Sequence, residues 1–173
     1  MHMPLTPHKK LFRFLSAPIL RIVMASFIAF GLDRFSKIII VHWLDLASVQ
    51  TIHVWPPYIN FVMAWNKGVN FGFLNEFNGR WLLVTFGVGC SLILVFWASN
   101  KPGWVLPLAS GAIIGGALGN VVDRVIYGSV ADYLNISCCT INNPFSFNVA
   151  DIFIFGGATL LFFGNETEFT HRK

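Results

Sequence analysis

The chain has 173 residues, of which 55% are hydrophobic and only 12% are charged, and its mean hydropathy is +0.63. This composition excludes an ordinary soluble domain and indicates an integral membrane protein, and the length suits a single domain. The net charge of +4 comes from basic residues that form no patch on a polar surface, and several of them flank apolar runs. The charge therefore indicates membrane topology and gives no support for a nucleic-acid partner.

The first apolar run extends from about residue 15 to residue 43 and follows a basic segment. It has no small-residue cleavage site, and its length predicts an uncleaved transmembrane helix instead of a signal peptide. Asp33, Arg34 and Lys37 interrupt its apolar pattern. Because Asp33 and Lys37 are one helical turn apart, they can form a local ion pair at the outer end of this helix.

The next stretch, about residues 45–79, predicts a small extramembrane β-rich element. Pro56 and Pro57 forbid a continuous helix there, and β-branched residues precede them. In the tail of the element Asn66, Gly68, Asn70 and Gly72 lie among aromatic residues, which indicates a turn at the membrane interface..

Three further apolar runs predict spans at about 81–99, 104–122 and 145–163. The turn near residues 100–103 makes the second and third spans antiparallel. Glycines at four-residue spacing on the third span allow another helix or lipid chains to approach closely. The last apolar run, which starts at Val149, is shorter than the roughly 20 residues needed to cross hydrocarbon. We therefore expect the embedded segment to begin before Val149 and to hold Asp151 below the outer surface.

The distribution of charge sets the predicted orientation. Four spans place both termini on one side, and the positive-inside rule assigns that side to the cytoplasm. The opposite side receives both long connections and most of the acidic residues, so a site formed there opens outward. The cytoplasmic set comprises Lys9, Lys10, Arg13, Arg21, Lys101, Arg172 and Lys173, and the outer acidic set comprises Asp33, Asp45, Glu76, Asp123, Asp132 and Asp151.

Polar residues gather where the third and fourth apolar runs meet the connection between them. Ionisable groups are costly near lipid and by default mark a functional site. The group consists of Asn120, Asp123 and Arg124 on one helical face, Asp132 in the connection, and Asn148 and Asp151 at the start of the last run.

Paired carboxylates point to acid/base chemistry. Two carboxyl groups about 3 Å apart cannot both ionise, so they share a proton and can activate water, as in aspartic proteases. This chemistry needs no metal and no cofactor. A zinc site is disfavoured because the histidines lie away from these aspartates and HExxH is absent, and a serine hydrolase is disfavoured because GxSxG is absent.

Simpler explanations exist for the same residues. Asn148 can cap the last helix with Asp151 in its first turn, and Asp123 with Arg124 can form an interfacial ion pair. At the level of the whole protein, a proton or ion carrier and an assembly protein without catalytic activity stay open as alternatives. The small number of spans and the lack of an internal repeat argue against a carrier.

The motifs GGALGNVVDR, SVADY and FNVAD, in this order and at this spacing, closely resemble those of the lipoprotein signal peptidase (signal peptidase II) family. GLDRFSK in the first span and WNKGVNFGFL after the β-rich element resemble two further motifs of the family. The departures, such as Ala131 and Tyr133 beside Asp132, are conservative. Together the motifs cover most of residues 25 to 160.

The resemblance implies an integral membrane protein that is mainly α, with four transmembrane helices and a small periplasmic β-rich element. It implies a monomeric aspartic endopeptidase of the bacterial inner membrane. The enzyme would cut prolipoproteins before a diacylglyceryl cysteine, would contact membrane lipid, and would bind globomycin-like inhibitors. By position Asp132 and Asp151 are the catalytic pair, while the supporting or substrate-binding residues are Asp33, Asn66, Gly68, Asn120, Asp123, Arg124, Asn148 and Ala150.

Overall fold

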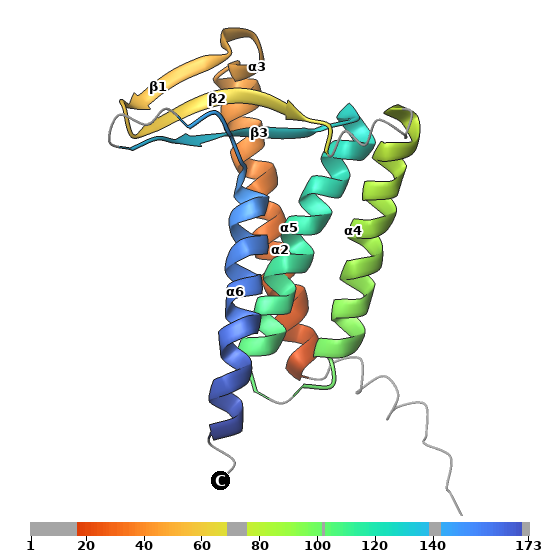
Figure 1. The fold of residues 1–173 in the computed structure, drawn as a ribbon. Helices are drawn as coiled ribbons and strands as arrows, with labels where there is room; N and C mark the ends of the chain where they lie inside the picture. The colour runs from red at the N-terminus through yellow and green to blue at the C-terminus, as the bar shows by residue number, and fades with distance from the viewer. Residues whose placement is uncertain (1–16, 69–75, 102, 139–142, 171–173) are drawn as a thin grey trace, which may run out of the picture.

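Four long helices form a bundle, and a small sheet lies across one end of it (Figure 1). The computed structural model describes residues 17–68, 76–101, 103–138 and 143–170. Both described ends of the chain lie at the end of the bundle away from the sheet. The long helices are α2 (Ala17–Lys37), α4 (Glu76–Ala98), α5 (Val105–Tyr127) and α6 (Val149–Thr170).

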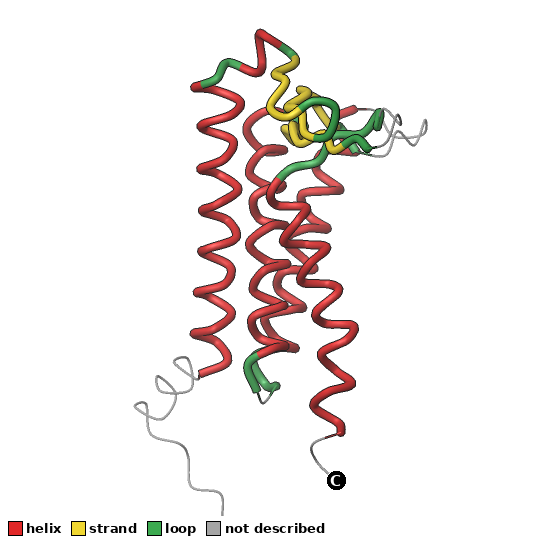
Figure 2. Tube along the Cα trace, turned by 90° about the vertical axis from the view of Figure 1, so that its left-hand side faces the viewer, coloured by secondary structure: helices red, strands yellow, loops and turns green. Residues whose placement is uncertain are grey.

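Helix α5 is the central helix, and α2, α4 and α6 all pack against it (Figure 2). Glycines make these approaches close. A Cβ at Gly111 would lie 2.5 Å from a backbone oxygen of α2, and a Cβ at Gly116 would lie 2.5 Å from the Ala150 oxygen of α6. The predicted packing role of the glycines is therefore confirmed, and helices occupy the space that lipid chains could have entered.

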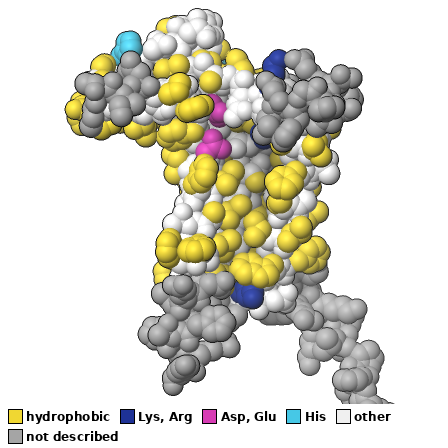
Figure 3. Space-filling view, in the orientation of Figure 1, with side chains coloured by type: hydrophobic (Ala, Val, Ile, Leu, Met, Phe, Trp, Pro, Cys, Tyr) yellow, Lys and Arg dark blue, Asp and Glu magenta, His cyan; other side chains and the backbone are white. Residues whose placement is uncertain are grey.

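The outer surface of the bundle is apolar (Figure 3). Large aromatic side chains face outward from three helices, including Phe27 with 77% exposed, Phe86 with 67% and Phe155 with 74%. Among the described residues, Gly79–Ala98 within α4 and the whole of α5 are long and apolar enough to cross a membrane, with mean hydropathies of 2.1 and 1.7. The fold is thus mainly helical with two clear apolar spans, and the spans expected in α2 and α6 stay predictions.

The sheet has three antiparallel strands in the order β1 (Thr51–Trp55), β2 (Ile59–Asn66) and β3 (Val130–Ile136). The π-helix η1 (Ile38–Trp43) and the short helix α3 (Leu46–Val49) connect α2 to β1. The β-rich element is confirmed for β1 and β2.

The sequence analysis missed β3, which it treated as part of a polar connection. Its partner lies far away in the chain, because Asp132 pairs with Ala64 and Val130 pairs with Asn66. Of the residues in the predicted interfacial turn, Asn66 is the last residue of β2, and Gly68 follows it in a turn with a φ of +86°. Asn70 and Gly72 lie outside the described residues.

A small apolar core attaches the sheet to the bundle. Tyr133 of β3 is fully buried among Val41, Leu46 and Met63. Its hydroxyl group lies 2.6 Å from the Ser36 hydroxyl of α2. Strand β3 is consequently fixed both to its neighbour β2 and to the end of the first long helix.

The start of α6 differs from the expected start of the fourth span. Phe145 to Asn148 are not helical, and the helix begins at Val149 and continues to Thr170. Residues 145–148 of the expected span 145–163 are therefore not helical, because Asn148 caps the helix. The expectation that the embedded segment begins before Val149 stays a prediction. The additional length lies at the carboxyl end.

Candidate active site

The predicted site residues meet where the sheet joins the bundle. Asp132 lies on β3, Asn120 on α5, and Asp151 in the first turn of α6. Acidic side chains are visible on this face of the molecule just beneath the sheet (Figure 3). The structure therefore brings together polar groups from three elements that the sequence places up to 31 residues apart.

Asp151 and Asn148 cap α6 reciprocally. The Asp151 backbone N–H donates to Asn148 Oδ1 at 2.9 Å, and the Asn148 backbone N–H donates to Asp151 Oδ2 at 3.3 Å. This is the geometry of a capping box, and it confirms the predicted cap. The cap also orients the Asp151 carboxylate, so the structural and catalytic interpretations of these residues are compatible.

Two asparagine amides connect the two aspartates. Asn148 Nδ2 donates to Asp132 Oδ1 at 2.6 Å and to Asn120 Oδ1 at 3.2 Å. Asn120 Nδ2 in turn donates to Asp151 Oδ1 at 3.0 Å. No hydrogen bond between the two carboxyl groups is found in the described part of the chain, so the amides bridge the pair and leave the space between the carboxyl groups for other atoms.

The second oxygen of Asp132 is held from β2. Asn66 Nδ2 donates to Asp132 Oδ2 at 3.0 Å, and the Gly68 N–H donates to Asn66 Oδ1 at 2.8 Å. Gly68 has a φ of +86°, a conformation that side chains other than glycine rarely adopt. The turn at Gly68 thus orients the Asn66 amide toward Asp132.

Burial changes the acidity of Asp132. Asp132 is only 3% exposed, and this loss of solvation is the main reason why its pKa is raised to about 6. This value already includes the charge of Asp151, which raises the pKa, and the hydrogen bonds from Asn66 and Asn148 and the charge of Lys37, which lower it. Asp132 consequently holds its proton up to a higher pH than an ordinary aspartate does.

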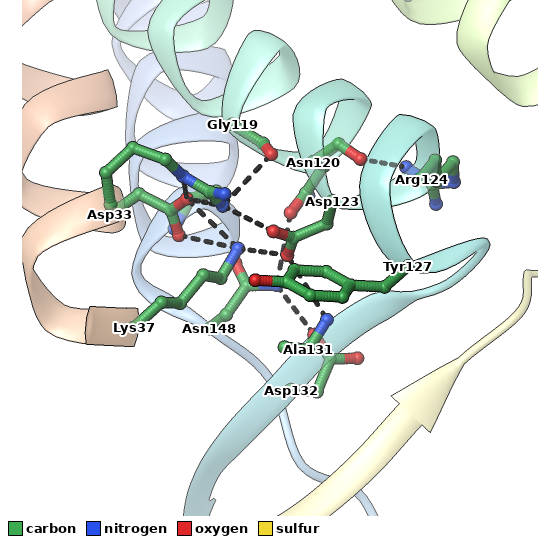
Figure 4. A network of polar contacts seen from close by, with 12 residues as sticks. Asp33, Lys37, Gly119, Asn120, Asp123, Arg124, Tyr127, Ala131, Asp132 and Asn148 are labelled. Atoms are coloured by element: carbon green, nitrogen blue, oxygen red, sulfur yellow. Dashed lines mark hydrogen bonds and ion pairs between the residues drawn. The ribbon is translucent and has the colours of Figure 1, made fainter. Parts of the chain in front are cut away.

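A cluster of four charges joins α2 to α5, and Figure 4 shows its members Asp33, Lys37 and Asp123 near Asn148. Arg34 Nη2 lies 2.7 Å from Asp33 and 2.7 Å from Asp123. Lys37 Nζ lies 3.0 Å from Asp33 and 2.6 Å from Asp123. The Asp33–Lys37 pair is confirmed, but it is buried and part of a larger cluster instead of being a local surface pair.

The expected pairing of Asp123 with Arg124 is wrong. Both cations beside Asp123 come from α2, whereas Arg124 Nη1 donates to the Asn120 carbonyl one turn earlier at 3.3 Å. Side chains of adjacent helical residues point in different directions, which separates the two groups. The Arg124 charge interacts electrostatically with Asp132, Asp151 and Asp123 without a direct ion pair to Asp123 among the described residues.

The charged cluster also holds the backbone beside each aspartate of the pair. Asp33 Oδ1 accepts a hydrogen bond from the Ala150 N–H at 3.1 Å, and Asp123 Oδ2 accepts one from the Ala131 N–H at 3.2 Å. Each alanine is fully or almost fully buried and directly precedes an aspartate of the pair. The sequence analysis did not assign Lys37 to the site, although its one-turn spacing from Asp33 was the available signal.

The fold is that of a helical membrane enzyme. Two solved structures described as a bacterial membrane enzyme, determined by the in meso method, share it with a TM-score of 0.70 and 21% sequence identity. The matches cover 90% and 84% of this chain and 93% and 92% of the respective solved chains. At this identity the likeness concerns the fold alone.

Sequence comparison identifies the family. The family model described as signal peptidase (SPase) II matches residues 25–165. A lipoprotein signal peptidase of Alteromonas mediterranea is 38% identical over 147 residues, covering 82% of this chain and 78% of the relative. One of Methylorubrum extorquens is 36% identical over 132 residues, covering 73% of this chain and 74% of the relative. The chain therefore belongs to the signal peptidase II family, a family of peptidases that process lipoproteins.

Proposed function

We propose that this chain is a membrane-embedded aspartic endopeptidase. It removes signal peptides from bacterial prolipoproteins by cleavage before a cysteine that already carries diacylglycerol. The observation that carries the proposal is the pair formed by Asp132 and Asp151, bridged by the amides of Asn120 and Asn148 at the junction of sheet and bundle. Family membership supplies the substrate class.

The two aspartates have different tasks in the proposed mechanism. We assign to Asp151 the role of the base that takes a proton from a water molecule, which attacks the scissile carbonyl carbon. Asp132, whose pKa is raised to about 6, carries the proton, polarises the carbonyl oxygen and then protonates the leaving amine. The reaction proceeds without a metal and without a cofactor.

The supporting residues keep this pair in position. Asn120, Asn148 and Asn66 orient the carboxyl groups, and Gly68 orients Asn66. Asp33 and Asp123 fix the backbone at Ala150 and Ala131. Arg124 places a positive charge near the developing negative charge of the tetrahedral intermediate, because it interacts with both catalytic carboxylates.

The proposed membrane arrangement has four spans, within α2, α4, α5 and α6. The protein lies in the bacterial inner membrane as a single domain and a monomer, with both termini in the cytoplasm. The sheet and the aspartate pair then lie at the periplasmic side. This arrangement lets a signal peptide approach laterally, with its lipid chains among the helices, and it lets globomycin-like cyclic peptides occupy the same cleft.

The test is incubation of the purified protein with a synthetic diacylated lipobox peptide, followed by mass analysis of the products. We expect a single cleavage directly before the modified cysteine. A proton or ion carrier would produce flux across liposomes and no cleaved peptide, and an assembly protein would produce neither. Intact peptide after prolonged incubation with a folded, monodisperse sample would overturn the proposal.

A further inference from the structure

A cavity lies between α2, α5 and α6, remote from the aspartate pair. Helices α2 and α6 both pack on α5 and diverge toward the end of the bundle away from the sheet (Figure 1, Figure 2). The groove between them has a volume of about 290 Å³. Arg21 at its rim precedes Lys37 by 16 residues, which corresponds to roughly 24 Å along a helix. The groove is lined by Arg21, Met24, Ala25, Ile28, Leu108, Ala112 and Phe153.

The lining of this groove is apolar except for Arg21. Met24 and Ile28 are 54% and 53% exposed on its α2 wall. The helices that form it belong to a membrane enzyme whose outer surface is apolar, so the groove opens toward hydrocarbon. Its volume is too small for another helix, which is about 10 Å wide, and suits a single flexible apolar chain.

Arg21 is the only charged residue that lines this groove. Its Nη1 donates to the Gly103 carbonyl at 2.5 Å, and the ion pairs found among side chains that the structure describes do not include it. Arg34, in contrast, contacts two carboxylates. A guanidinium group has five donors, and its planar geometry matches a phosphate.

We propose that this groove binds an anionic glycerophospholipid. One acyl chain fills the apolar groove, and the phosphate binds Arg21 at its rim. An anionic lipid is favoured over a zwitterionic one because Arg21 is the only charged residue in the lining of the groove and is basic. Basic pockets between membrane helices are known to recognise anionic headgroups. The site is distinct from the proposed catalytic site and contains none of its residues.

The test measures thermal unfolding of the full-length protein in detergent during titration with phosphatidylglycerol or with phosphatidylcholine of the same acyl chains. We expect phosphatidylglycerol to stabilise the wild type at a lower mole fraction. Arg21→Gln weakens the apparent affinity for phosphatidylglycerol about fivefold and leaves the response to phosphatidylcholine unchanged. Met24→Trp, which narrows the groove, weakens binding of both lipids.

Lys101→Gln is the matched control. Lys101 is also basic and lies two positions before Gly103. It does not line the groove, and its Nζ lies 4.9 Å from the Trp97 ring centroid. It should retain the preference for phosphatidylglycerol. Inorganic phosphate alone should produce no shift, and an equal shift would indicate a free-anion site and overturn the lipid assignment.

Native mass spectrometry of the wild type supplies a readout that does not depend on the variants. After exchange into mixed lipid, one retained phosphatidylglycerol molecule per protein supports the site. Equal responses of the wild type to both lipids, or the same loss of preference in Arg21→Gln and Lys101→Gln, would overturn it. Arg21 would then be a topology signal without a specific ligand.

Discussion

Asp132 and Asp151 occupy unlike environments although they serve one proposed reaction. Asp132 is buried on a strand and receives two asparagine amides, whereas Asp151 belongs to a helix cap. Differences of this kind separate the acidities of two neighbouring carboxyl groups, which is what a reaction with one acid and one base requires. The different surroundings therefore explain how two chemically identical side chains can take different roles.

The first prediction concerns the pair itself. Asp132→Asn and Asp151→Asn should each reduce cleavage of a diacylated lipobox peptide by at least roughly 10²- to 10⁴-fold, without loss of thermal stability. Asparagine preserves volume and hydrogen bonding but cannot exchange the proton. Asp45→Asn is the control, because Asp45 carries an exposed carboxylate outside the site. Activity near that of the wild type in either catalytic variant would refute the assignment.

The second prediction uses the raised pKa of Asp132. Because its folded pKa is about 6 and its ordinary value is 3.8, the folded state binds the proton more tightly than the unfolded state does. Ionisation of Asp132 therefore costs stability, and this cost appears as the pH rises from about 4 to 6 and is complete above 6. Asp132→Asn removes the cost.

The measurement is the melting temperature of wild type and Asp132→Asn between pH 4 and 8. The difference, variant minus wild type, should increase up to about pH 6 and then level off. A difference that stays constant over this range would show that burial does not raise the pKa of Asp132.

At the scale of elements, the charged cluster connects helices that are otherwise joined by apolar contacts. Asp33, Arg34 and Lys37 come from α2 and Asp123 comes from α5, and all four are buried or nearly so. Pairing two cations with two carboxylates fixes the register of α2 on α5 at the level of the site. The cluster then transmits that register to the backbone at Ala131 and Ala150.

The third prediction follows from this cluster. Asp123→Ala leaves Arg34 and Lys37 short of one partner in a buried site, which typically costs about 3–5 kcal/mol. We expect a lower yield and a lower melting temperature, with residual activity per folded molecule. Asp45→Asn, which removes an exposed charge and suits the positive φ of this position, should have little effect. A variant of normal melting temperature that is catalytically inactive would instead place Asp123 in the reaction itself.

Some helices could be predicted from the sequence, whereas strand β3 could not. Apolar runs locate α4 and α5 because span length is a local property. Strand β3 could not be predicted from its own residues, since its pairing with β2 depends on residues more than 60 positions away. Likewise, Asp123 was assigned to its neighbour Arg124 because the sequence does not show which helix face meets α2. The family motifs identified the aspartate pair, whereas spacing alone left Asp123 and Asp132 equivalent.

At the scale of the whole molecule, the site lies at the boundary between an apolar bundle and a sheet that covers one end of it. If the proposed function holds, the substrate reaches this site from the membrane more readily than from water. Its signal helix would supply part of the required apolar surface, and each buried acyl CH₂ would add about 0.8 kcal/mol.

The fourth prediction is that an unlipidated lipobox peptide is cleaved far less efficiently than its diacylated form. Matched initial rates at equal peptide concentration in one detergent provide the comparison, and an Asp151→Asn sample supplies the background for both peptides. Equal rates would mean that lipid recognition is absent from this site and that the enzyme is a more general intramembrane aspartic protease.

The four-charge cluster also bears on how the chain enters the membrane during synthesis. In the proposed membrane arrangement, α2 emerges from the ribosome with Asp33, Arg34 and Lys37, so it carries one excess positive charge near the end that faces the sheet. Asp123, which neutralises that charge, is made 86 residues after Lys37. Until α5 arrives, the end of α2 has an uncompensated cation that resists transfer into lipid. Insertion of α2 to its final depth is thereby coupled to synthesis of α5. A nascent chain halted at the turn before α5 should therefore expose Lys37 to water-soluble reagents. The same reagents should not reach Lys37 in the finished protein.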